Sequence, residues 1–153
     1  MQRRVDVVQT GLSMIDYLDD REMIARCGEL GIDVVIYEPL ASGILTGKTL
    51  EEVRATWTGP WVHSSFYQRL LAPGRAERSF AVADGVRAIA QRLGSTVAQV
   101  AIAWVLRQPG VTAAIAGSKD GRHMRENAEA TDMDLGDALD ELDGLISFGP
   151  AFG

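Results

Sequence analysis

Short apolar runs alternate with amphipathic stretches along this chain. Residues 5–9 and 32–37 are rich in valine and isoleucine, and each run ends close to a turn-forming glycine or proline, so each predicts a buried strand. Between them, apolar residues recur at positions 23, 24, 27 and 30, which predicts a helix that stops at Gly31. A strand, a helix and a second strand joined by short loops predict a parallel βαβ unit.

The second half of the chain continues this alternation. The apolar pattern predicts helices over 76–93 and from Ser95 or Thr96 to 105, a third buried strand over 111–116, and two further helices that end near 130 and 146. Thr49 and Glu52 have the spacing of a capping box and predict a short helix there. We therefore expect one α/β domain over 1–153 with about three parallel strands, divided into 5–48, an irregular excursion over 49–75, and 76–153.

Composition and charge narrow the class of protein. The 153 residues are 46% hydrophobic with a net charge of −6, which favours a folded protein and disfavours nucleic acid as a partner. No stretch approaches the roughly 20 apolar residues of a membrane helix, so we expect a soluble, cytoplasmic chain. Cys27 is the single cysteine, so no internal disulfide can form, and its place on an apolar helix face predicts a small buried residue. His63 and His123 are too few for a zinc site and have no partners at a catalytic spacing.

The carboxyl ends of the predicted strands are where ligand sites form in α/β proteins. Gln9 could contact a carboxamide or satisfy nearby backbone groups, and Tyr37 could stack on a planar cofactor or pack in the core. Residues 117–119 (Gly-Ser-Lys) precede a helix and could bind a phosphate, or form a capped surface turn.

A different interpretation concerns residues 42–49. They end in Gly-Lys-Thr like a Walker phosphate-binding loop, but Ser42 stands where that pattern has its first glycine, and Pro39 ends the strand before the loop begins. A Walker-type phosphate binder is therefore the less favoured alternative.

The segments taken together resemble the aldo-keto reductases. Three segments are similar to the sixth and seventh strands of that family: Val-Val-Gln at 7–9, residues 27–31, and Tyr-Glu-Pro-Leu-Ala-Ser-Gly-Ile-Leu-Thr-Gly-Lys at 37–48. Residues 96–106 resemble its seventh helix, and 111–127 its eighth strand and cofactor turn. The resemblance covers about 5–146 and is closest to the branch of bacterial general reductases and potassium-channel β subunits.

This resemblance implies the C-terminal part of a (β/α)8 barrel that binds NADP(H). Gln9 and Tyr37 would contact the nicotinamide, the loop after Tyr37 would line the pyrophosphate, and the turn after the third strand would hold the 2′-phosphate and adenine. Glu38 and His123 depart from the residues common in the family, and Glu38 puts an acid beside the cofactor path. The implied cofactor residues are Gln9, Tyr37, Leu40, Ser42, Gly43, Leu45, Lys48, Gly117, Ser118, Lys119, His123, Glu126 and Asn127.

The family's reaction transfers a hydride to a carbonyl carbon, and it depends on an aspartate, a tyrosine, a lysine and a histidine. These groups lie on earlier strands than the ones this chain resembles, so no catalytic residue is assigned. We expect the NADP(H)-binding portion of an oxidoreductase acting on a small carbonyl substrate, truncated and inactive alone. The alternative is a stand-alone or split-barrel regulatory module that pairs with a separate N-terminal half. Exposed strand edges also predict self-association.

Overall fold

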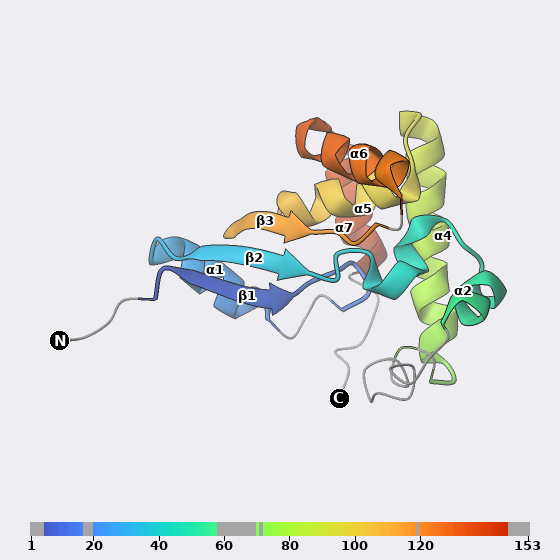
Figure 1. The fold of residues 1–153 in the computed structure, drawn as a ribbon, viewed down its shortest axis with the longest axis horizontal. Coiled ribbons are helices and arrows are strands. Elements are labelled where there is room, and N and C mark those ends of the chain that lie inside the picture. Colours follow the sequence, from blue (N-terminus) through green and yellow to red (C-terminus); the bar gives the residue numbers. More distant parts are fainter. Residues whose placement is uncertain (1–4, 17–19, 58–69, 71, 119, 147–153) are drawn as a thin grey trace.

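Within the part of the chain that the structure describes, three strands and six α-helices follow one another in the predicted order, and two short 3-10 segments that were not predicted lie among them (Figure 1). The computed structural model describes residues 5–16, 20–57, 70, 72–118 and 120–146. In chain order the elements are β1 (Val7–Gly11), α1 (Arg21–Glu29), β2 (Asp33–Tyr37), the 3-10 segment η1 (Ala41–Thr46), α2 (Leu50–Thr56), α4 (Arg75–Leu93), α5 (Val97–Leu106), β3 (Val111–Ile115), α6 (Gly121–Glu129), the 3-10 segment η3 (Ala130–Asp132) and α7 (Ala138–Ile146).

The strands form one parallel sheet in the order β1-β2-β3, as the predicted βαβ unit requires. The register pairs Gly11 with Tyr37 and Tyr37 with Ile115, so the three strands end together at one edge of the sheet. Because side chains alternate along a strand, the two faces differ. Val34 and Ile36 are fully buried on the face that α1 and α5 cover, whereas Tyr37 and Ile115 are exposed on the other.

Helix α5 lies at the centre of the core, between β3 and the 3-10 segments η1 and η3. Its apolar residues face in all directions, as expected of a helix that is buried on every side. Trp104 has no exposed surface, and its indole N–H donates a hydrogen bond of 2.7 Å to the Asp143 carboxylate on α7. This contact fixes α7 against α5.

Local signals define the helix ends. Thr96, rather than Ser95, is the N-cap of α5, and it forms a reciprocal capping box with Gln99. The predicted capping box of Thr49 and Glu52 is likewise present at the start of α2. The excursion predicted for 49–75 therefore begins with a regular helix, and most of its remainder lies outside the described residues.

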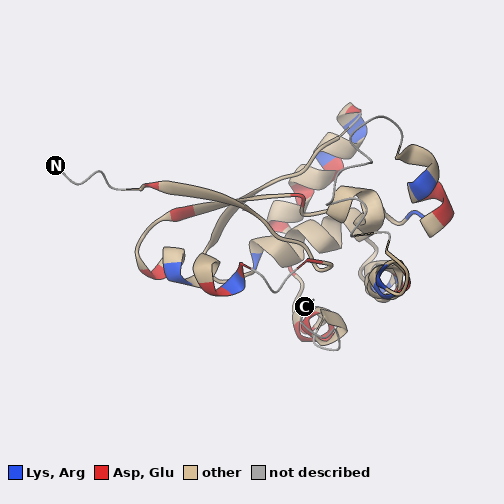
Figure 2. Ribbon diagram, turned by 90° about the horizontal axis from the view of Figure 1, so that it is seen from below, with Lys and Arg blue, Asp and Glu red and all other residues tan. Residues whose placement is uncertain are grey.

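Cys27 is buried on α1, as the sequence predicted. Acidic and basic residues are interspersed on most helices, while α7 carries acids only (Figure 2). Within the described part of the chain, no single helix is long and apolar enough to cross a membrane. Helices α4 and α5 reach that length and hydropathy only together, as a pair bent by 98°. His63 and Trp61 lie outside the described residues.

Candidate functional site

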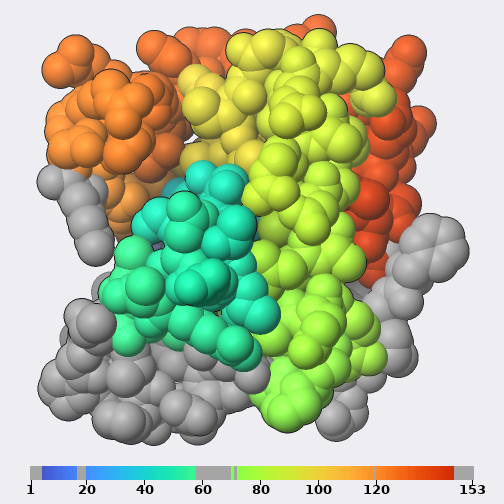
Figure 3. All heavy atoms as spheres, turned by 90° about the vertical axis from the view of Figure 1, so that its right-hand side faces the viewer, coloured from blue at the N-terminus to red at the C-terminus, as the bar shows by residue number. Residues whose placement is uncertain are grey.

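A cleft of about 880 Å³ opens at the carboxyl end of the sheet. One wall is the segment from Tyr37 through η1 to α2, and the other is the turn after β3 with the first half of α6. In the space-filling view, η1 and α2 pack against α4, and the segment around α6 lies above them (Figure 3). Ten of the predicted cofactor residues line the cleft: Tyr37, Leu40, Ser42, Gly43, Lys48, Gly117, Ser118, His123, Glu126 and Asn127.

Three predicted residues are placed differently. Gln9 is exposed on the open face of the sheet, two residues before the end of β1, and does not line the cleft. Leu45 has no exposed surface and packs in the hydrophobic core, so its side chain does not reach the cleft. Lys119 lies outside the described residues.

Tyr37 extends over the end of β1 instead of packing in the core. Its side chain is 45% exposed, and a Cβ atom on its partner Gly11 would lie 3.0 Å from the ring carbon Cε2. Glycine at position 11 therefore leaves room for the ring to lie close against the backbone. The aromatic face is available to a planar group at the sheet edge, next to the exposed Gln9.

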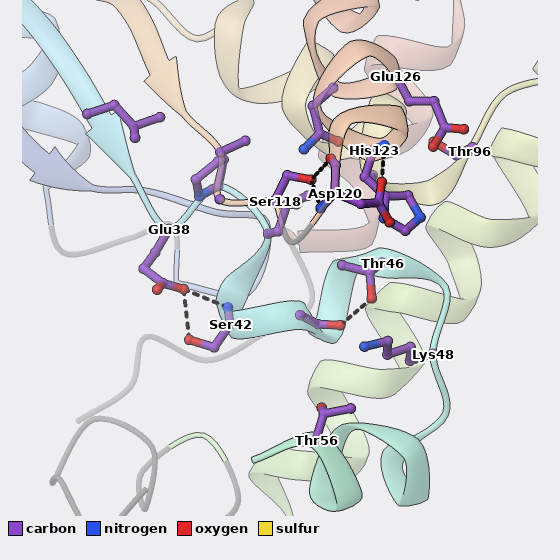
Figure 4. Close-up of a pocket in the computed structure, with 18 of the residues that line it drawn as sticks. Glu38, Ser42, Thr46, Lys48, Thr56, Thr96, Ser118, Asp120, His123 and Glu126 are labelled. Carbon is purple, nitrogen blue, oxygen red and sulfur yellow. Dashed lines mark hydrogen bonds and ion pairs between the residues drawn. The ribbon is translucent and has the colours of Figure 1, made fainter. Parts of the chain in front are cut away.

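The loop after β2 has an unusual backbone. Glu38, Ala41 and Ser42 have positive φ angles of 58°, 47° and 54°, and Gly43 has 98°. Residues other than glycine rarely adopt this left-handed region, so surrounding contacts must hold them there. The Glu38 carboxylate accepts hydrogen bonds from Ser42 (Figure 4). From the other side, the Trp57 indole N–H donates a hydrogen bond of 2.8 Å to the Ser42 carbonyl.

Lys48 supplies a positive charge to this wall of the cleft (Figure 4). It is half-buried and makes no ion pair or hydrogen bond with another described residue. Close by, the pKa of the Glu52 carboxyl lies below its usual value. The main cause is the hydrogen bond that the Thr49 backbone N–H donates to this carboxylate, followed by the one from the Thr49 hydroxyl; the positive charge of Lys48 adds a smaller effect.

The opposite wall is built on the N-terminus of α6. Asp120 caps this helix, and its carboxylate accepts a hydrogen bond of 2.9 Å from the His123 backbone N–H, which lowers the pKa of Asp120. Ser118 donates to the Asp120 carbonyl at 2.7 Å. Arg122 lies 3.2 Å from the Glu126 carboxylate and 3.0 Å from the imidazole Nε2 of His123. This wall therefore combines a helix N-terminus and two basic side chains with two acids.

Several lining residues were not predicted from the sequence. Asp120, Arg122, Thr96, Thr46 and Trp57 also face the cleft. The Asp120 cap and the Arg122–Glu126 spacing could have been recognised from the helix pattern. Thr46 and Trp57 carried no such signal, because only the path of the folded chain brings them to this edge.

The geometry does not fit a Walker loop. In that motif the threonine hydroxyl binds magnesium at the start of a helix, whereas the Thr49 hydroxyl is engaged in the capping box with Glu52. Helix α2 begins only at Leu50, after the Gly-Lys-Thr sequence. Over the described ranges, no three His, Cys, Asp or Glu side chains are grouped so that they could hold a metal ion.

The sequence of this chain is similar to those of known proteins. A protein of Escherichia coli K12 named NADH-specific methylglyoxal reductase is 27% identical over 137 residues, which cover 88% of this chain and 39% of that protein. A probable voltage-gated potassium channel subunit beta of Arabidopsis thaliana is 32% identical over 103 residues, or 67% of this chain and 31% of that protein. The chain thus spans well under half the length of either relative.

The fold agrees with these sequence matches. The structure of a glycerol dehydrogenase from Gluconobacter oxydans superposes with a TM-score of 0.75 at 20% identity, over 96% of this chain and 46% of that one. Together with the three parallel strands, this match confirms the prediction of a partial (β/α)8 barrel. The model of the aldo/keto reductase family matches residues 2–143. The chain therefore belongs to the aldo/keto reductase family.

Proposed function

We propose that the cleft binds a nicotinamide dinucleotide, preferably NADP(H), and that this chain is the cofactor-holding part of an oxidoreductase that interconverts carbonyl and alcohol groups. The observation that carries the proposal is the convergence of three segments on one cleft: the end of β2 with its left-handed loop, Lys48, and the N-terminus of α6. The cleft volume of about 880 Å³ is within the 300–1,000 Å³ typical of cofactor sites.

The residues along the cleft suit successive parts of a dinucleotide. The exposed Tyr37 ring offers a face for the nicotinamide, and Gln9 offers amide groups beside it. The loop amide of Ser42 and the Lys48 ammonium suit a diphosphate. Gly117, Ser118, Glu126 and Asn127 line the far end, where the adenosine would lie. When bound, the nicotinamide supplies a hydride; the residues of this chain hold and orient it.

The preference for NADP(H) depends on the far end of the cleft. Ser118, Arg122 and His123 lie at the N-terminus of α6, whose partial positive charge would favour a 2′-phosphate there. Lys119 adds a cation by its place in the sequence. The Asp120 carboxylate opposes this preference. The E. coli relative is named NADH-specific, so the titration compares both dinucleotides.

The test is a fluorescence titration of the 153-residue chain with NADPH and NADH. Trp57 lines the cleft and its indole N–H donates to the Ser42 carbonyl, so the tryptophan emission of the chain should change when the cleft is occupied. Lys48→Gln should weaken binding about ten- to a hundredfold, since a charge-assisted hydrogen bond contributes roughly 1.5–3 kcal/mol. Arg92→Gln, which removes an exposed cation that faces Glu141, is the matched control and should bind as the wild type does.

Two results would refute the proposal: a folded chain that binds neither dinucleotide, or a Lys48→Gln variant that binds like Arg92→Gln. Because the family's catalytic tetrad is expected on earlier strands, the chain alone should bind cofactor without oxidising NADPH in the presence of a small aldehyde.

A further inference from the structure

The Glu38 side chain folds back onto the loop that the dinucleotide would contact. Its carboxylate oxygen Oε2 accepts one hydrogen bond from the Ser42 backbone N–H at 2.6 Å and another from the Ser42 hydroxyl at 2.7 Å. Both residues line the cleft, and the close-up shows the contact at its edge (Figure 4).

Most neighbouring loop amides are committed to the main chain. The N–H of Ala41 donates to the Glu38 carbonyl, and those of Gly43 and Leu45 donate to the Leu40 carbonyl. The Ser42 N–H differs because its acceptor is a side chain. A side chain can rotate away without breaking the turn, so this amide and the adjoining hydroxyl can change partners.

A carboxylate and a phosphate use the same donors. Both present negatively charged oxygens that form short hydrogen bonds to N–H and O–H groups. The Glu38 carboxylate therefore holds the Ser42 donors as a phosphate oxygen would, and the two anions cannot share them. Like charges a few ångströms apart also repel, by about 1–4 kcal/mol near a protein surface.

We infer that Glu38 is an internal competitor for the cofactor: its carboxylate occupies the Ser42 N–H and hydroxyl, and it must swing out before a diphosphate can bind. The inference rests on the proposed dinucleotide function and adds a residue that sets the affinity of that site. The backbone of Glu38 is left-handed, at φ 58°, and the two hydrogen bonds to Ser42 offset the cost of that conformation.

Three variants test the inference. Glu38→Gln keeps the length of the side chain and an acceptor oxygen but removes the charge, and Glu38→Ser removes both the charge and the reach to Ser42. Glu51→Gln removes one negative charge from an exposed position in the first turn of α2, outside the cleft, and serves as the control. Thermal melts of all three establish that each variant is folded.

The probes are NADPH, NADH and inorganic pyrophosphate, titrated calorimetrically into the wild type and each variant. Both Glu38 variants should bind each probe about tenfold or more tightly than the wild type, and Glu51→Gln should not. The gain should shrink as salt rises from about 0.05 to 0.5 M, because salt screens the repulsion. In the wild type, pyrophosphate should shift the backbone amide resonance of Ser42, which reports the exchange of partners independently of affinity.

The outcomes separate the inference from the function on which it rests. Equal affinity of wild type and Glu38 variants, or weaker binding by the variants, overturns the competitor role and leaves the dinucleotide site standing. Absence of binding by every folded variant overturns the proposed function and the inference together. Tighter binding by Glu51→Gln to the same degree would assign the effect to net charge and also overturn the inference.

Discussion

Helix α1 crosses the turn before β3 at a point where two glycines meet. A Cβ atom on Gly110 would lie 2.4 Å from the Ile24 carbonyl oxygen, and one on Gly28 would lie 2.8 Å from the Gly110 Cα. Gly110 also has a φ angle of 90°. A Gly110→Ala substitution should therefore be strongly destabilising, because the obstacle is backbone of α1 and cannot rotate aside.

The expected loss of stability in Gly110→Ala has two contributions. A left-handed conformation costs alanine about 1–2 kcal/mol, and overpacking a close contact costs about 1–3 kcal/mol. We expect a loss of about 2–5 kcal/mol in the free energy of unfolding for Gly110→Ala. Gly94 is the matched control, because it is left-handed at φ 65° and a Cβ atom added there would have no neighbouring atom within 4 Å; Gly94→Ala should show the first part only.

Urea unfolding followed by circular dichroism measures both variants. The difference between them should be about 1–3 kcal/mol, or roughly 2–12 °C in Tm for a chain of this size. If Gly110→Ala is no less stable than Gly94→Ala, the close approach of α1 to this turn does not limit the packing, and the reasoning is refuted.

Two further predictions concern helix caps. Thr96→Ala should destabilise the chain by about 1 kcal/mol by removing the reciprocal capping box of α5, whereas Thr96→Ser should retain most of it; equal loss in both variants, measured by urea unfolding, would argue against the cap. The Asp120 pKa is lowered on folding, chiefly by the His123 N–H, so the stability it contributes is fully present above about pH 4 and is lost as pH falls through the lowered pKa. An NMR titration of the Asp120 carboxyl that gives a midpoint at or above the usual value of about 3.9 would contradict this.

Much of the fold was predictable because its signals are local. Val34 and Ile36 lie in a short β-branched run, and the Thr49 and Thr96 caps depend on residues three positions away. Such features report the hydrogen bonding and burial of a single element. The main departure was the loop after β2, where the left-handed residues and the 3-10 turns of η1 follow from contacts with Trp57 and the core.

The candidate site was predictable only in part. Ser42, Lys48 and Ser118 were named by resemblance, and the structure brings them to one cleft. Leu40 and Leu45 looked alike in the sequence, yet the first lines the cleft and the second is buried in the core. A turn with irregular backbone angles has no fixed period, so which side chains face the cleft could not be counted from the sequence.

The sequence by itself determined the order and type of the elements, since hydrophobic period, caps and glycine stops act between near neighbours in the chain. The tertiary structure decided which groups meet: Tyr37 over Gly11, Gly28 against Gly110, and the Glu38 carboxylate on Ser42. These contacts depend on strand register, on helix packing and on the path of the loop after β2. Each arises from steric fit and hydrogen bonding in three dimensions, which no linear pattern encodes.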